Sequence, residues 1–96
     1  MHSIMTLLDQ MKSEKADSYN YAKCALKHKA SDPSLADLYI SLARTEMEHY
    51  SKLYAQVDRL LNDRPVEENI KEMREWLTAN AAEELNSMRQ MIESYR

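Results

Sequence analysis

The stretch KASDPSL at residues 29–35 decides the fold, because it ends one long helix-forming segment and begins another. Asp32 is suited to accept hydrogen bonds from free backbone N–H groups as an N-cap, and Pro33 suits the first position of the following helix. Long helices joined by a short turn must be antiparallel neighbours. The stretch therefore predicts a helical hairpin that turns near Ser31.

Apolar residues on both sides of this turn recur at helical spacing and predict helices over about residues 3–29 and 33–61. A second break, NDRPVEE at residues 62–68, precedes a third predicted helix over about residues 66–95. We expect one all-α domain over residues 1–96, an antiparallel bundle of three helices completed by self-association. The inner stripe of the second helix is expected to contain Leu35, Leu38, Leu42, Leu53, Val57 and Leu60. The inner stripe of the third is expected to contain Val66, Ile70, Met73, Leu77, Ala81, Met88, Met91 and Tyr95.

The composition limits the partners and the setting. A net charge of −3, with thirteen basic residues spread along the chain, forms no basic patch and argues against nucleic acid. No segment approaches the ~18 apolar residues of a membrane span, so we expect no membrane partner. Cys24 is the only cysteine and cannot form an intrachain disulfide, which favours a cytoplasmic setting.

The stretch RTEMEHYSKLY at residues 44–54 places two polar side chains on the inner stripe of the second helix. Glu46 and His49 are three residues apart, so their side chains point in the same direction. Glu48 aligns instead with other charged residues on the outer face and is expected to contact solvent. The stretch thus predicts an inward carboxylate beside an inward imidazole.

Counting from the turns predicts which polar residues share one level of the bundle. Glu14, Glu46 and His49 each lie 15 to 18 residues from Ser31, and so at about the same height. Glu84, twenty residues beyond Arg64, and Asn80, sixteen beyond it, reach a similar level on the third helix. Carboxylate oxygens and imidazole nitrogens suit iron, manganese or zinc. The predicted metal ligands are Glu14, Glu46, His49 and Glu84.

Two segments carry a family resemblance: EKADSYNYAKCAL at residues 14–26 and LADLYISLARTEMEHYSKLYAQV at residues 35–57. Together they resemble the first helical hairpin of the ferritin-like superfamily, especially its rubrerythrin branch. The resemblance implies that Glu14 and Glu46 are terminal or bridging carboxylate ligands of iron and that His49 is a terminal nitrogen ligand. It also implies ferroxidase or peroxide-reducing chemistry.

The chain departs from that pattern because it has a single Glu-x-x-His and no histidine after His49. A complete four-helix di-iron site within one chain is therefore excluded. Encapsulated ferritins are more similar, since they have one hairpin per chain and build the di-iron site across a dimer. Short prophage-type proteins resemble the hairpin too, and that resemblance implies only a fold.

Two functions of different classes follow. The first is a ferritin-like protein that binds iron, as one or two ions, with manganese or zinc as alternatives, and self-associates as a dimer or higher homo-oligomer. The second is a non-enzymatic helical interaction or structural module that retains the hairpin as a scaffold. A phage-related module is one version of this alternative. Enzymatic activity is left open between them.

Overall fold

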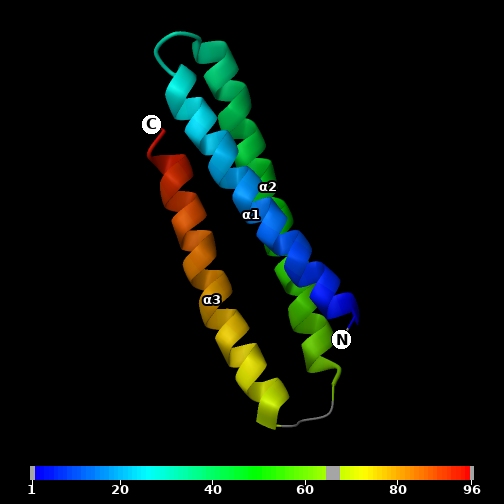
Figure 1. The fold of residues 1–96 in the computed structure, drawn as a ribbon. Coiled ribbons are helices and arrows are strands. Elements are labelled where there is room, and N and C mark those ends of the chain that lie inside the picture. Colours follow the sequence, from blue (N-terminus) through cyan, green and yellow to red (C-terminus); the bar gives the residue numbers. More distant parts are fainter. Residues whose placement is uncertain (1, 65–67, 96) are drawn as a thin grey trace.

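The computed structural model describes residues 2–64 and 68–95, and within those ranges it consists of three α-helices without a strand. Helix α1 spans His2–His28, α2 spans Pro33–Asn62 and α3 spans Glu68–Glu93. Figure 1 shows α1 and α2 packed side by side as a hairpin, with α3 running along one side of it. The molecule is a rod of 54 × 20 × 13 Å. The prediction of an all-α fold is confirmed.

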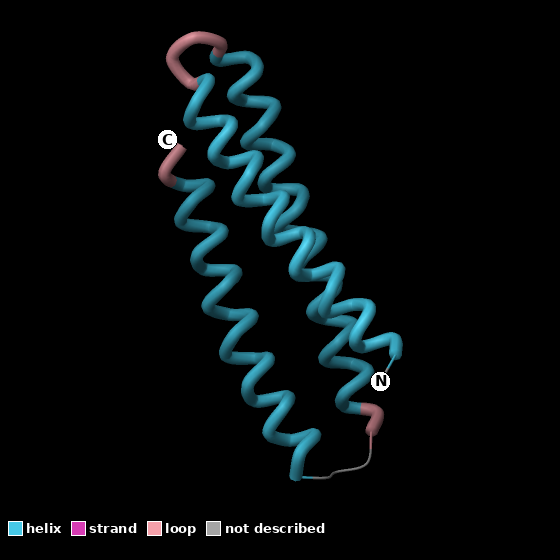
Figure 2. Tube along the Cα trace, in the orientation of Figure 1, coloured by secondary structure: helices cyan, strands magenta, loops and turns pink. Residues whose placement is uncertain are grey.

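The first turn forms as its residues predict (Figure 2). Asp32 Oδ1 accepts a hydrogen bond from the backbone N–H of Leu35 at 3.2 Å, and Pro33 is the first residue of α2. The N–H of Asp32 in turn donates to the carbonyl of His28 at 2.8 Å, which satisfies an end carbonyl of α1. The predicted start of the third helix at residue 66 lies outside the described residues.

Toward the turn, buried alanines line the contact between α1 and α2. Ala22 and Ala25 from α1 are fully buried, as are Ala36 and Ala43 from α2. Such small side chains allow two helix backbones to approach closely. Ser18 is buried in the same contact, and its hydroxyl donates to the carbonyl of Ala43 at 2.9 Å. The hairpin is thus held by a close contact that also satisfies its buried hydroxyl.

The predicted inner stripe of α2 is wrong in most of its residues. Leu38 was expected inside but is 54% exposed, and most of the other predicted leucines are only half-buried. The buried face of α2 is therefore rotated relative to the predicted stripe, and its leucines lie along the edges of that face. Val57 belongs to both the predicted and the observed stripe. The residues of α2 that are buried are Ala36, Ile40, Ala43, Tyr50, Val57 and Leu61.

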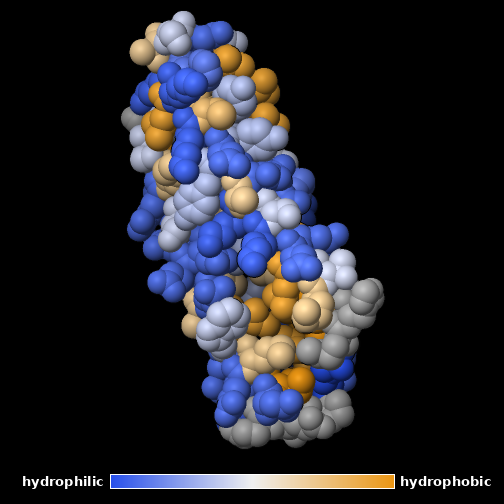
Figure 3. Space-filling view, viewed as in Figure 1, coloured by the Kyte–Doolittle hydropathy of each residue, from blue (hydrophilic) through white to orange (hydrophobic). Residues whose placement is uncertain are grey.

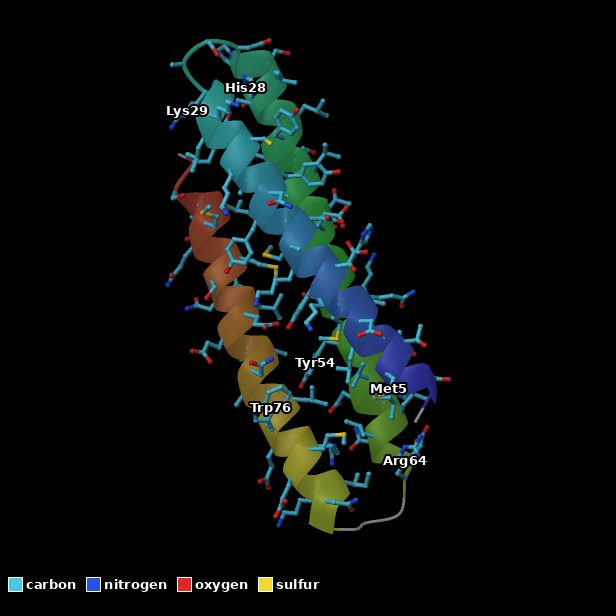
Figure 4. All side chains as sticks on the ribbon, in the orientation of Figure 1. Met5, His28, Lys29, Tyr54, Arg64 and Trp76 are labelled. Carbon is cyan, nitrogen blue, oxygen red and sulfur yellow. The ribbon has the colours of Figure 1, made fainter. Side chains whose placement is uncertain are left out.

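Helix α3 packs through the stripe that the sequence predicts. Leu77, Ala81 and Met88 are buried, and Ile92 extends the same face. The hydroxyl of Tyr54, which lies between α2 and α3 in Figure 4, donates to Thr78 Oγ1 at 3.0 Å. None of the three described helices is long and apolar enough to cross a membrane.

Candidate metal centre

Three of the predicted ligands meet on the hairpin. Glu14 comes from α1, and Glu46 and His49 come from successive turns of α2. His49 Nδ1 lies 3.4 Å from Glu14 Oε2 and 3.9 Å from Glu46 Oε2. One ligand atom of each residue lies within 4.8 Å of the others. Among the described residues, this is the only such group of three or more His, Cys, Asp or Glu side chains.

The two carboxylates are more sheltered than the imidazole. The side chains of Glu14 and Glu46 are 24% and 18% exposed, whereas that of His49 is 47% exposed. The prediction of an inward imidazole is therefore wrong, because His49 lies at the surface of the hairpin beside the two carboxylates. Glu14 Oε2 is shielded from solvent and accepts no hydrogen bond. A carboxylate oxygen that has lost water without gaining a donor is costly to the fold, and a bound cation would compensate it. The residues present therefore fit a metal ion with oxygen and nitrogen ligands.

The group lies on a part of the hairpin that α3 does not cover. Lys15 and Tyr50 contact α3, and each directly follows a member of the group in the chain. Successive helical residues point about 100° apart. Glu14 and His49 therefore point around their helices and away from α3. Glu48 is exposed, as the sequence predicts.

The structure does not bring Glu84 into this group. Its Oε1 forms an ion pair with Lys15 Nζ at 2.9 Å, and its Oε2 accepts a hydrogen bond from the hydroxyl of Tyr50. Because these partners are the chain neighbours of Glu14 and His49, the predicted height of Glu84 is correct. Its side chain approaches the hairpin from a different side than the predicted ligand group, because Glu84 extends from α3 toward the side of the hairpin on which α3 packs.

Hydrogen bonding sets the charge state of Glu84. Burial by itself would raise the pKa of this carboxyl, but hydrogen bonds from Tyr50, Lys15 and Asn80 and the charge of Lys15 together lower it. For Tyr50, burial and the interaction with Glu84 raise the pKa of the hydroxyl. Glu84 is thus ionised and Tyr50 is neutral around pH 7. The sequence patterns assign no role to Lys15, although it lies at helical spacing between the buried residues Met11 and Ser18 of α1.

We expect acid to remove the contribution of Glu84 to stability. Because its pKa is lower in the folded state, this contribution is complete above the ordinary value of 4.5 and is lost as the pH falls through the folded value. At pH 7 the wild type should exceed Glu84→Gln by about 1–2 kcal/mol in free energy of unfolding, and the difference should shrink as the pH falls well below 4.5. Urea unfolding measures both proteins, with the exposed Glu83→Gln as control. A difference that stays constant with pH would contradict this assignment.

Comparisons of the chain with models of protein families, with curated proteins and with solved structures found no match. The resemblance to ferritin-like hairpins therefore stays a prediction from the residues themselves. The geometry of the Glu14, Glu46 and His49 group is the basis of the function proposed below.

Proposed function

We propose that this chain is a ferritin-like metal-binding protein in which Glu14, Glu46 and His49 hold an iron ion. The observation that carries the proposal is the shielded Glu14 Oε2, which accepts no hydrogen bond and lies beside a second carboxylate and an imidazole. The nearest imidazole nitrogen, His49 Nδ1, is 3.4 Å away, beyond the usual range of about 2.7–3.2 Å for an N–H···O hydrogen bond, so this contact leaves the oxygen poorly satisfied. A cation between the three side chains would neutralise the two carboxylates and satisfy the oxygen together.

The donor set narrows the choice of metal. One imidazole nitrogen with carboxylate oxygens suits iron, manganese and zinc better than calcium, which takes oxygen ligands. The ferritin-like resemblance favours iron among these three. Bound iron would supply ferroxidase or peroxide-reducing chemistry. Glu14 and Glu46 would bind and neutralise the ion, and His49 would supply its nitrogen ligand.

Self-association is the second part of the proposal. Ferritin-like di-iron sites use a Glu from each of two helices and a Glu-x-x-His from each of two more. This chain contributes half of that set on a hairpin side that α3 leaves uncovered. The same side of α1 continues through Tyr21, whose ring stacks on that of Tyr39 at 6.2 Å between centroids. Two hairpins that face each other would complete four helices and shelter the ligands from water.

Metal binding is tested on the wild type and a matched pair of variants. At a free metal concentration tenfold above Kd, a ligand specific for the folded state adds about 1.4 kcal/mol, or about 5–10 °C in Tm for a domain of this size. We expect Fe(II) without oxygen, and Mn(II), to produce such a rise in the wild type and in Glu48→Gln. Glu46→Gln should show none, and elemental analysis of the purified proteins should agree. An unchanged wild-type Tm together with no bound metal would refute the proposal.

A helical interaction module is the second candidate, and the exposed Leu38 on the hairpin favours it. Sedimentation with a chelator and with metal separates the two functions. The metalloprotein proposal expects a dimer that is stabilised by metal and weakened in Glu46→Gln. If the protein contains no bound metal and its dimerisation is changed neither by added metal nor by Glu46→Gln, the result would instead support the interaction module.

A further inference from the structure

A cleft with a largely apolar lining lies between α1 and α3, apart from the Glu14, Glu46 and His49 group. It has a volume of about 220 Å³. Its apolar lining consists of Leu8 and Met11 from α1 and Leu77 and Ala81 from α3. Figure 3 shows hydrophobic side chains in a hollow on this face. Trp76, which is 64% exposed, stands on α3 at the edge of the cleft (Figure 4).

The polar side of the cleft carries an excess of positive charge. Lys12, Lys15 and Glu84 all line it. Glu84 neutralises Lys15 through their 2.9 Å ion pair. Lys12 is exposed and has no ion-pair partner in the part of the chain that the structure describes. An occupant that carries one negative charge would therefore be complementary to this cleft.

We propose that the cleft binds a small amphipathic carboxylate, with its apolar tail between α1 and α3 and its carboxylate paired with Lys12. The volume is somewhat larger than the ~150 Å³ apolar cavity that accommodates benzene, so it suits a single ring or a medium-length alkyl chain. One turn of a helix about 10 Å in diameter occupies roughly 400 Å³, more than the volume of the cleft, so a helix of a second copy would not fit inside it. Trp76 and Leu77 supply the apolar contact, and Lys12 supplies the preference for an anion.

The single tryptophan of the chain reports binding directly, because Trp76 borders the cleft. We would titrate metal-free protein with octanoate below its micelle-forming range and follow the Trp76 emission. Octanol has the same tail without the charge, and acetate has the charge without the tail. We expect a saturable blue shift with octanoate, clearly weaker binding of octanol and no response to acetate. Absence of a saturable change, or octanol binding as tightly as octanoate, would overturn the proposal.

Two charge reversals on α1 locate the carboxylate. Lys12 lines the cleft, whereas Lys23 is exposed on the same helix and is not among the residues that line the cleft. Lys12→Glu should weaken octanoate binding about five- to tenfold and leave octanol binding unchanged. Lys23→Glu should leave both unchanged. Equal weakening by the two variants would show a nonspecific charge effect. An octanoate Kd that rises with protein concentration would show that a second copy occupies the cleft. Either result would overturn the proposal.

Discussion

Met88→Ala should lower the free energy of unfolding by about 2–5 kcal/mol, because it leaves a cavity where α3 packs on the hairpin. Met88 is 0% exposed and belongs to the cluster that also contains Tyr50 and Val57 from α2 and Leu77 from α3. Domains of this size are stable by only about 5–15 kcal/mol in total. One truncated side chain should therefore remove a large part of the stability.

Met5→Ala is the matched control for this substitution. Met5 is 57% exposed on α1, and alanine favours helix at least as well as methionine does. Its effect should fall within about 0.5 kcal/mol. Urea unfolding followed by circular dichroism gives both values from the same fit. Similar losses in Met88→Ala and Met5→Ala would show that α3 does not pack as the structure describes.

The order of the helices and their turn could be predicted because each depends on local chemistry. Asp32 and Pro33 define the start of α2 through local hydrogen bonding and backbone geometry, which do not depend on contacts with distant residues. The height of the polar residues also follows from counting, since the rise per residue of a helix is constant. Glu84 therefore lies at the predicted level, next to the chain neighbours of Glu14 and His49.

The rotation of α2 could not be predicted from the sequence in the same way. Leucines at helical spacing are the strongest apolar signal in the sequence of α2. They predict that the face with Leu38 is buried and that the face with Ala36 and Ala43 is not. Helix packing depends on how closely two backbones approach, and alanines allow the closest approach. Helix α2 is therefore oriented with Ala36 and Ala43 buried and with Leu38 exposed.

For the candidate site, too, the sequence predicts the level of the residues but not the side of the hairpin on which they lie. Counting placed Glu14, Glu46, His49 and Glu84 at one level, and the structure confirms that level. It separates Glu84 from the other three because α3 packs on only one side of the hairpin, where Lys15 and Tyr50 hold its carboxylate. Periodicity gives a direction relative to the same helix, and it cannot say on which side a third helix will pack.

Glu14→Gln separates a metal ligand from a structural carboxylate. In the metal-free protein, Glu14 Oε2 accepts no hydrogen bond, has His49 Nδ1 at 3.4 Å and lies close to the carboxylate of Glu46. An amide of the same shape removes one negative charge and adds N–H donors, so the metal-free variant should be as stable as the wild type or more stable by up to about 1 kcal/mol. If Glu14 instead held the hairpin together through His49, the same substitution would destabilise the metal-free protein.

The most direct test of the metal site is the free energy of unfolding of wild type and Glu14→Gln, each with a chelator and with Mn(II) at about a hundredfold above Kd. We predict that metal adds about 2.7 kcal/mol to the wild type and nothing to Glu14→Gln, and that the two proteins are equally stable in the chelator or the variant is slightly more so. A wild type that does not respond to metal, together with a Glu14→Gln variant that is at least about 1 kcal/mol less stable in the chelator, would contradict the account.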